Sequence, residues 1–373
     1  MSNLFRSLGT KLKKTLLTTS DVNVPSAGAV KRYVIKKNNK VAFANMNKAD
    51  KRLFVRNFKG IASSNDSNTW NSVCWSPELG MFVAVGDAVS GLNRIMYSTN
   101  GISWISATSP AAHVWNSVCW SAELGMFVAV ASDGTNEAMY STNGTSWTAV
   151  TTLGTLDNNA WQSICWSAEL GMFVAVAYSG TNRVMYSVNG TSWTAVTTLG
   201  ALDNNGWYSV CWSPELGMFA AVAVYGTNKV MYSTNGTSWS AISSTAFDSN
   251  TWYSVCWSPE LGMFAAVAVY GTNCVIYSVN GTSWTGVTSS NDSNGWASVC
   301  WSPELGMFVA VAWTGSNRVM YSTNGTSWTS ISSTAFNSNT WNSICWSYEL
   351  GMFIAVAVSG TNRVMRSLSL KEF

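Results

Sequence analysis

The chain has 373 residues, of which 47% are hydrophobic and only 10% are charged. With 1 His against 21 Trp, it cannot hold a repeated His-based zinc site or Ser-His-Asp triad. Its longest apolar stretches fall far short of the ~20 residues that a membrane-spanning helix needs. The net charge of +3 is unevenly divided, because residues 1–60 carry 14 Lys and Arg against two Asp. This split predicts a basic arm attached to an acidic body.

Residues 1–50 form the predicted basic arm. Leu recurs four positions apart near its start with basic residues between, a pattern typical of a short amphipathic helix, and a Pro-Ser-Ala-Gly linker follows. The basic residues assigned to anchoring are Arg6, Lys11, Lys13, Lys14, Lys31, Arg32, Lys36 and Lys37. Three roles suit such an arm: a solvated tail, an anchor to other proteins of a particle, or a contact with nucleic acid or an anionic membrane surface.

Seven of the 8 Cys occur in one repeated context, Val-Cys-Trp or Ile-Cys-Trp. Equivalent positions on successive units point the same way, so disulfides between them are geometrically awkward. We interpret these thiols as small buried side chains of a protein made in a reducing cytoplasm. Lysines interrupt the N-terminal apolar residues, so no secretory signal peptide is predicted. The absence of Cys-x-x-Cys spacing predicts no metal site, and no cofactor is expected.

Internal repetition dominates the chain after residue 60. The Trp residues that open successive units lie 44 to 46 positions apart: Trp70, Trp115, Trp161, Trp207, Trp252, Trp296 and Trp341. One unit reads W-x-S-V-C-W-S-P-E-L-G-M-F-V-A-V-A and, after a short loop, T-N-R-V-M-Y-S-T-N-G-T-S-W-T-x-V. A fixed period of this kind is the signature of a repeat architecture.

Each unit is predicted to contain four short strands and no helix. In the fourth unit the strands cover residues 207–213, 218–223, 229–233 and 237–242. Pro-Glu-Leu-Gly separates the first two and Asn-Gly the last two, and both are hairpin signals. Four antiparallel strands in about 45 residues are typical of one blade of a β-propeller. The sequence therefore predicts an all-β, seven-bladed propeller over residues 51–373.

The two ends of the repeat region complement each other. The seventh unit stops after its third strand, because Arg366-Ser367-Leu368 stands where an Asn-Gly turn is expected. Near the other end, residues 58–70 match residues 284–296, with Phe58 in the place of Trp284. We therefore expect residues 54–63 to supply the outer strand of the last blade. This pairing closes the ring and leaves no large open sheet edge.

The segment Ser141-Thr142-Asn143-Gly144-Thr145-Ser146-Trp147 resembles the Asp-box turn of sialidase-like propellers. It has Asn in place of Asp and one residue fewer before Gly, and the resemblance implies a structural turn without a catalytic role. The whole unit, over residues 58–367, resembles tandem propeller repeats of large DNA viruses and bacteriophages, which implies a viral origin.

The resemblance to sialidases does not extend to their chemistry. That family needs three Arg side chains converging on a substrate carboxylate. Here the Arg residues occupy equivalent positions at third-strand starts, which places them toward the blade periphery: Arg94, Arg183, Arg318 and Arg363. The chain is therefore predicted not to be an enzyme.

Any binding site is expected on the face opposite the hairpin turns, because the turns are nearly invariant among the units whereas the opposite face varies. Aromatic side chains occur there after the second strand or directly after the opening Trp, and they suit stacking on a sugar or contact with a protein. The candidates are Tyr178, Tyr208, Tyr225, Tyr253, Tyr270 and Trp313. Unselected drift among recently duplicated units is the alternative.

Each blade also carries one Glu in its first hairpin turn: Glu78, Glu123, Glu169, Glu215, Glu260, Glu304 and Glu349. Two interpretations stay open. The carboxylates form a ring that attracts cations or a basic segment, or they are solvated turn residues with local hydrogen bonds. Their even spread around the ring argues against a metal site.

These features predict a non-enzymatic structural or attachment protein of a virus particle, located in the virion. Its partners would be other particle proteins, held by the arm, and a glycan or host receptor on the variable face. The alternatives are a soluble glycan-binding propeller and an intracellular interaction scaffold.

Overall fold

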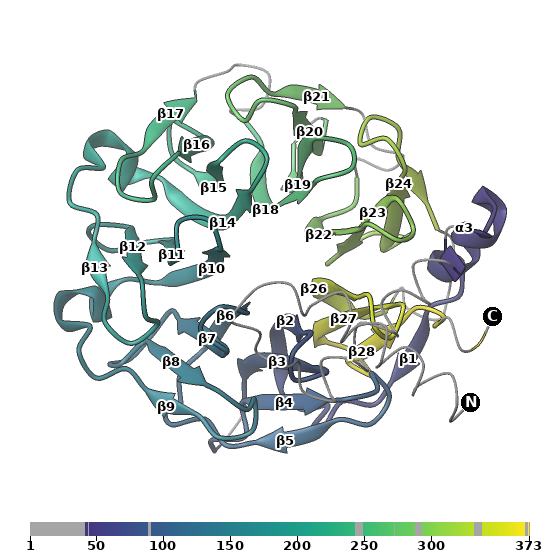
Figure 1. Cartoon of the computed structure of the whole chain (residues 1–373), viewed down its shortest axis with the longest axis horizontal. Coiled ribbons are helices and arrows are strands. Elements are labelled where there is room, and N and C mark those ends of the chain that lie inside the picture. Colours follow the sequence, from purple (N-terminus) through teal and green to yellow (C-terminus); the bar gives the residue numbers. More distant parts are fainter. Residues whose placement is uncertain are drawn as a thin grey trace, which may run out of the picture.

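Each repeat folds into one four-stranded antiparallel sheet, and seven such sheets stand as blades around a central channel (Figure 1). The computed structural model describes residues 42–43, 45–88, 91–242, 249–271, 273–287, 293–331, 338–369 and 372. The predicted fold class is therefore confirmed. The eight basic residues assigned to the arm lie outside the described residues. The Leu residues of its predicted amphipathic helix lie outside them as well.

The strands follow the chain order outward in the first six blades. Blade 1 contains β2 (Thr69–Ser76), β3 (Met81–Asp87), β4 (Ile95–Ser98) and β5 (Ile105–Ala107). Blade 2 contains β6 (Trp115–Ser121), β7 (Met126–Ala131), β8 (Ala138–Ser141) and β9 (Thr148–Ala149). Blade 3 contains β10 (Trp161–Ser167), β11 (Met172–Ala177), β12 (Val184–Ser187) and β13 (Thr194–Ala195).

The same order holds in the next three blades. Blade 4 contains β14 (Gly206–Ser213), β15 (Met218–Tyr225), β16 (Val230–Ser233) and β17 (Ser240–Ile242). Blade 5 contains β18 (Thr251–Ser258), β19 (Met263–Tyr270), β20 (Val275–Ser278) and β21 (Thr285–Val287). Blade 6 contains β22 (Trp296–Ser302), β23 (Met307–Ala312), β24 (Val319–Ser322) and β25 (Thr329–Ser330). The outer strands are shorter than expected, because residues 237–239 belong to the turn that precedes β17.

Blade 7 is completed by the N-terminal part of the chain. Its strands β26 (Thr340–Ser347), β27 (Met352–Ser359) and β28 (Val364–Arg366) are followed by β1 (Lys59–Ile61) at the outer edge. In this antiparallel pair Lys59 lies opposite Arg366 and Ile61 opposite Val364. The predicted closure is confirmed, but its bounds were too wide. Residues 54–56 belong to the helix α3 (Lys48–Arg56), which also crosses the expected boundary at residue 50.

Two further short helices depart from the prediction that the repeat contains no helix. The 3-10 helices η1 (Gly154–Asn158) and η2 (Gly200–Asn204) lie in the connections that lead into blades 3 and 4. Each places a buried Leu, Leu156 or Leu202, against the blade that follows. Within the described residues, no helix has the length and apolar character needed to cross a membrane.

The core lies between the blades and is built from the repeated apolar residues. All seven Trp residues that open the units are at most 1% exposed. The second strand of each blade is buried on both faces, which explains its continuous apolar sequence. Because every blade packs on two neighbours, these aromatic rings and the aliphatic residues of the second strands are buried together between blades.

Two repeated hydrogen bonds join each blade to the next. The hydroxyl of the Ser two positions after each opening Trp accepts from a backbone amide of the following blade at 3.1 to 3.2 Å, as Ser72 does from Val118. The turn Glu accepts from an indole of the following blade at 2.6 to 2.7 Å, as Glu78 does from Trp120. The seven carboxylates are thus links between blades. Most of them are exposed turn residues, as one interpretation expected, but their hydrogen bonds reach the neighbouring blade instead of staying within the turn.

The Gly of each Asn-Gly turn is required by the same packing. Gly101 has φ of 70°, and a Cβ added to it would lie 2.8 Å from Sδ of Met352 in the preceding blade. Ser98 and Asn100 hold the turn by accepting backbone N–H groups, Gly101 and Ser103 among the donors. Gly is therefore needed at this turn for two reasons: its positive φ, and the close approach of the preceding blade, which leaves no room for a side chain.

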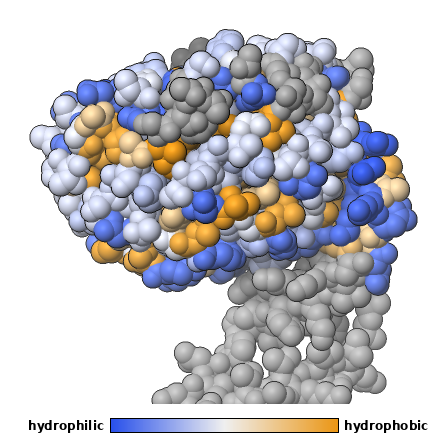
Figure 2. Space-filling model, turned by 90° about the horizontal axis from the view of Figure 1, so that it is seen from above, coloured by the Kyte–Doolittle hydropathy of each residue, from blue (hydrophilic) through white to orange (hydrophobic). Residues whose placement is uncertain are grey.

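Helix α3 covers the part of blade 6 that the missing seventh Asn-Gly turn leaves open. Phe43 and Phe54 are 1% and 0% exposed and join the cluster that contains Leu305 and Met307 of blade 6. Lys51 Nζ donates to the carbonyl oxygen of Glu304 at 3.0 Å. The helix begins at the cap Asn47, whose side chain accepts from the amide of Asp50. Figure 2 shows hydrophilic side chains gathered at the edge where α3 lies.

Candidate functional site

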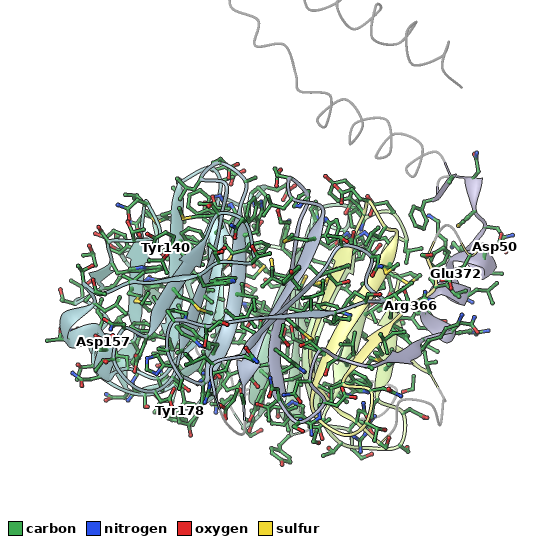
Figure 3. All side chains as sticks on the ribbon, turned by 90° about the horizontal axis from the view of Figure 1, so that it is seen from below. Asp50, Tyr140, Asp157, Tyr178, Arg366 and Glu372 are labelled. Atoms are coloured by element: carbon green, nitrogen blue, oxygen red, sulfur yellow. The ribbon has the colours of Figure 1, made fainter. Side chains whose placement is uncertain are left out.

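The propeller has two different faces. The loop face carries the loops between second and third strands and the connections between blades, and the turn face carries the Glu-Leu-Gly and Asn-Gly turns. In Figure 3, Tyr178 and Asp157 lie toward the loop face, whereas Asp50 of α3 lies toward the opposite side. Helix α3, which we call the base of the arm because the arm leads into it, and the variable loops therefore lie toward different sides of the propeller.

A recess opens at the loop-face end of the central channel, and we call it the channel mouth. Its volume is about 210 Å³. The residue after each opening Trp lines its wall: Asn71, Asn116, Gln162, Tyr208, Tyr253, Ala297 and Asn342. Ser side chains from six blades form its floor: Ser72, Ser163, Ser209, Ser254, Ser298 and Ser343. None of the described residues that line it carries a formal charge at neutral pH.

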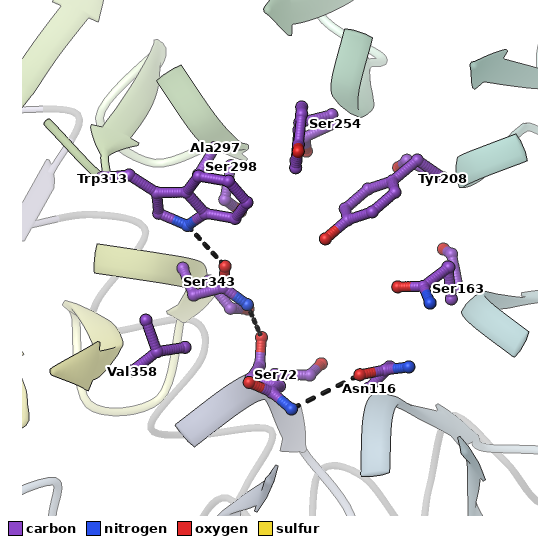
Figure 4. Close-up of a pocket in the computed structure, with 15 residues that line it drawn as sticks. Ser72, Asn116, Ser163, Tyr208, Ser254, Ala297, Ser298, Trp313, Ser343 and Val358 are labelled. Carbon is purple, nitrogen blue, oxygen red and sulfur yellow. Dashed lines mark hydrogen bonds between the residues drawn. The ribbon is translucent and has the colours of Figure 1, made fainter. Parts of the chain in front are cut away.

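One side of the channel mouth is an aromatic wall, defined by Tyr208, Tyr253 and Trp313. The ring centroids of Tyr208 and Tyr253 are 4.3 Å apart, and those of Tyr253 and Trp313 are 4.6 Å apart at 75°. Trp313 comes from the loop after β23 and lies beside Ala297, the one small residue of the wall (Figure 4).

The other side is a polar arc, defined by Asn342, Asn71, Asn116 and Gln162. Trp313 Nε1 donates to Asn342 Oδ1 at 2.6 Å, and Asn342 Nδ2 donates to the carbonyl oxygen of Asn71 at 2.7 Å. Asn71 Nδ2 and Asn116 Nδ2 donate to the carbonyl oxygens of Trp115 and Trp161. Figure 4 shows the first two of these bonds and a third, from Asn71 Nδ2 to Asn116 Oδ1 at 3.4 Å, and together they link side chains of four blades.

Four polar groups at the channel mouth make no hydrogen bond to any described residue: the Asn71 carbonyl oxygen Oδ1, the Gln162 amide and the hydroxyls of Tyr208 and Tyr253. Burial raises the pKa of Tyr253 to about 12, and the neighbouring Tyr270 and Tyr178 add to the shift. Burial also raises the pKa of Tyr208. Both phenols are therefore neutral donors at physiological pH and poor nucleophiles.

The remaining predicted aromatic residues lie beside the channel mouth in blades 3 to 5. Tyr178 and Tyr225 pack edge to face with centroids 4.9 Å apart, and the Tyr225 hydroxyl donates to the Tyr178 carbonyl at 2.6 Å. Arg183 Nη1 donates to the same hydroxyl at 3.0 Å. Tyr225 therefore links two blades, while Tyr178 and Tyr270 are 41% and 67% exposed.

The Arg residues at third-strand starts bind backbone rather than facing a common point. Arg183 donates to the carbonyl oxygen of Asn205, Arg318 to that of Asn339 and Arg363 to that of Asn68. Arg94 pairs with Asp87 and donates to the carbonyl oxygen of His113. Each guanidinium thus ties its blade to the start of the next one.

Blade 2 has an acid at this position. Glu137 is 2% exposed, and its Oε2 has no hydrogen-bond partner among the described residues. Burial raises its pKa to about 9, and the nearby carboxyls of Asp157 and Asp133 contribute to the shift. The described residues contain no group of three His, Cys, Asp or Glu side chains that could hold a metal ion.

The repeated thiols line the opposite end of the channel. A wide recess of about 390 Å³ on the turn face includes Cys74, Cys119, Cys165, Cys300 and Cys345. All eight cysteines are free, as the prediction against disulfides requires. The seven repeated ones are half-buried rather than fully buried as expected, because they face the channel. Burial nevertheless raises the pKa of Cys74 to about 12.

Sequence reasoning selected the aromatic wall and missed the polar arc. Asn71, Asn116, Gln162 and Asn342 occupy the same repeat position as Tyr208 and Tyr253. The signal for all of them was variation at one position of an otherwise repeated unit. Their cooperation became visible only once the blades were arranged in a ring.

These features define a seven-bladed β-propeller with a small uncharged recess at one end of its channel. No family model matches the chain, and no curated protein sequence matches it. Solved propellers do resemble it in structure. Virginiamycin B lyase from Staphylococcus aureus aligns with a TM-score of 0.70 at 10% identity, over 84% of this chain and 99% of that one.

Two further structures show the range of proteins with this fold. YCF48 from Cyanidioschyzon merolae aligns with a TM-score of 0.62 at 13% identity, over 85% of this chain and 99% of that one. The GH74 enzyme of Niastella koreensis aligns with a TM-score of 0.63 at 14% identity, over 83% of this chain and 53% of that one. At such identities the similarity shows the fold alone, and two of these three proteins are enzymes.

Proposed function

We propose that this chain is a non-enzymatic attachment protein of a virus particle. Its basic arm holds it to other particle proteins, and its loop face presents a binding site outward. The observation that carries the proposal is the placement of α3, which follows the arm, and of the variable loops on different sides of the propeller.

The contacts of α3 support the tethering part of this proposal. Phe54 is fully buried against blade 6, and Lys51 bonds to the turn that contains Glu304. Attachment through the arm would therefore hold the propeller by its turn-face side. The loop face would stay free to meet a partner.

The chemistry of the channel mouth favours binding over catalysis. General acid–base catalysis needs a group that exchanges a proton near the working pH. The lining side chains are amides, hydroxyls and aromatic rings, and the raised pKa of Tyr253 keeps its phenol protonated. Two enzymes with the same fold do not change this reading, because enzymatic function depends on site residues rather than on the propeller itself.

The viral part of the proposal rests on the resemblance of the repeat to tandem propellers of large DNA viruses and bacteriophages. It also rests on the charge division along the chain, because residues 1–60, with 14 basic residues against two acidic ones, suit an acidic or phosphate-bearing surface in a particle. Free thiols with raised pKa values fit synthesis in a reducing cytoplasm.

The test is recovery of the chain with purified virus particles from a producing host. The full chain and a variant with Lys11, Lys13 and Lys14 changed to Glu would be compared at equal expression. We expect the full chain in the particle fraction and the charge-reversed chain in the soluble fraction. Absence of the full chain from particles would contradict the proposal and favour a soluble glycan-binding propeller or an intracellular scaffold.

A second arm of the experiment separates the partners of the arm. Nuclease and detergent treatment of the particles would release a chain held by nucleic acid or by a membrane surface. Retention after both treatments is the result expected for anchoring to particle proteins. A propeller variant such as Tyr348→Ala, which changes the turn face but no arm residue, serves as the matched control.

A further inference from the structure

We propose that the channel mouth binds the terminal, uncharged sugar residue of a glycan. The sugar ring lies against the aromatic wall of Tyr208, Tyr253 and Trp313, and its hydroxyls meet the polar arc. This inference deepens the attachment role and relies on it only for the glycan's place on a host surface. The binding chemistry itself follows from the site.

The dimensions of the channel mouth favour a single ring. Its volume of about 210 Å³ lies below the roughly 300–1,000 Å³ typical of pockets for drug-sized ligands. The recess is closed on its sides by seven blades, and the Ser hydroxyls form its floor. A ligand can therefore enter only end-on from the loop face. A terminal residue of a chain meets this condition, whereas an internal residue does not.

The aromatic wall offers apolar ring surface on one side only, with neighbouring rings tilted by 53° and 75° to each other. The three rings form a continuous row across blades 4, 5 and 6, with neighbouring centroids 4.3 and 4.6 Å apart. Trp313 is held in place by its 2.6 Å bond to Asn342. A preformed wall binds a ligand without the cost of ordering its side chains. A pyranose ring has one face of C–H groups, which can lie against the face of one of these rings while the neighbouring rings border it.

The polar arc supplies donors and acceptors on the other side. Asn342, Asn71 and Asn116 use their Nδ2 groups to bond the protein, and this fixes the direction of each amide. Asn71 Oδ1 and the Gln162 amide remain for a ligand, together with the phenol groups of the wall. Sugar hydroxyls both donate and accept, so they can satisfy this mixed set of groups.

The electrostatics select against charged sugars. None of the described lining residues is a cation that could pair with a carboxylate or sulfate. Arg183 and Arg318 follow Tyr178 and Trp313 in their loops, and both guanidinium groups already donate to backbone oxygens of the protein. An acidic sugar would lose its hydration without gaining a partner, which is unfavourable.

The test uses the full chain on an array of glycans that end in uncharged sugars and in their sialylated or sulfated counterparts. We expect binding to a subset with uncharged termini, with competition by the methyl glycoside of the same terminal sugar. Preference for the charged counterparts would overturn the proposal. Competition by nucleosides or by an uncharged peptide, in place of methyl glycosides, would also overturn it.

Variants taken from the other blades keep the fold while removing the site. Trp313→Ser introduces the residue that Ser132 provides in blade 2, and Tyr253→Asn introduces the residue that Asn116 provides there. Each is expected to weaken binding about tenfold or more, which corresponds to about 1.4 kcal/mol. Tyr348→Ala on the turn face is the matched control and should leave binding unchanged. Equal binding by all three variants would place the sugar elsewhere and contradict the proposal.

The two proposals fail in different ways. If the chain is present in particles but binds no glycan, the sugar site is wrong and the attachment role stands with another ligand. If the chain binds uncharged glycans but is absent from particles, the sugar site stands and the particle role is wrong. Circular dichroism and the unfolding midpoint of each variant would distinguish lost binding from lost folding.

Discussion

The indole Nε1 of Trp75 in blade 1 donates a 2.7 Å hydrogen bond to Oε2 of Glu349 in blade 7. The same Trp–Glu bond joins every other pair of neighbouring blades. The junction where the ring closes is therefore built like the other junctions, although its two residues are 274 positions apart in sequence.

Removing this bond should weaken the closure of the ring. Glu349→Ala leaves the largely buried Trp75 indole without its acceptor, and we expect a loss of about 1–3 kcal/mol in the free energy of unfolding. Urea unfolding followed by Trp fluorescence measures it. Glu349→Gln retains an acceptor oxygen and should lose less. Equal losses in the two variants would show that the carboxylate acts by something other than this bond.

The C-terminal Glu372 should make closure sensitive to acid. Hydrogen bonds from Arg366 hold the pKa of this carboxyl well below its ordinary value, and Lys59 of β1 adds a contact at 3.4 Å. A lowered pKa stabilises the folded state above the ordinary pKa of about 4.3, and this stabilisation is lost as the pH falls below it. The side chain of Glu372 is 29% exposed, so we expect only about 1 kcal/mol.

The measurement is the unfolding free energy of the wild type and of Glu372→Gln at pH 7 and pH 3. The wild type should be the more stable at pH 7, and the difference should shrink at pH 3. A difference that grows at low pH would contradict the assignment.

Glu137 should have the opposite dependence on pH. Its pKa is raised to about 9 in the folded protein, whereas the ordinary pKa of a Glu is about 4.3. Between these two pH values the folded protein keeps the Glu137 proton and the unfolded chain has lost it. The stability of the wild type should therefore fall between about pH 5 and pH 9. Glu137→Gln replaces the protonated acid with a neutral side chain and should be free of this loss.

The free energy of unfolding of Glu137→Gln, relative to that of the wild type, should increase by at most about 1.4 kcal/mol per pH unit between about pH 5 and pH 9. Thermal unfolding at pH 5, 7 and 9 tests this. The control is Asp203→Asn in blade 4, because Asp203 lies outside the group formed by Glu137, Asp157 and Asp133. An equal gain at pH 5 and pH 9 would rule out titration of Glu137 as the cause.

The base of the arm should contribute substantially to stability. Phe54 is 0% exposed between α3 and blade 6, where it covers the surface left by the absent seventh turn. Phe54→Ala should cost about 3–5 kcal/mol, the range typical of a buried aromatic residue. The neighbouring Leu53, which is 39% exposed, offers a control because its replacement by Ala should cost little. Equilibrium unfolding of both variants decides whether α3 is part of the folded propeller.

The repeated cysteines should react slowly with thiol reagents in the folded state. The thiolate is the reactive form, and burial raises the pKa of Cys74 and Cys211 to about 12. At pH 8 we expect slow labelling by a disulfide reagent in buffer and fast labelling of all eight thiols in denaturant. Rapid labelling of the native protein would show that the turn-face recess exposes thiolates.

The sequence by itself determined the architecture of this protein. Repeated opening Trp residues and two hairpin signals per unit specify seven blades, because the strand pattern and turn chemistry are local properties that repeat with the chain. The match between residues 58–70 and residues 284–296 also predicted which segment closes the ring, since a missing strand at one end and an extra one at the other must pair.

Only the tertiary structure decided how residues of different blades cooperate. The bond from Trp313 to Asn342 and the one from Trp75 to Glu349 join side chains whose contact no local pattern encodes. Residues 54–56 were predicted to be strand but belong to α3. The apolar residues of this helix are buried against blade 6, a contact distant in sequence that no local pattern indicates. Periodicity specifies each blade, but the wall of the channel mouth takes the residue after the opening Trp from each of seven blades, and their relative positions are fixed only by closure of the ring.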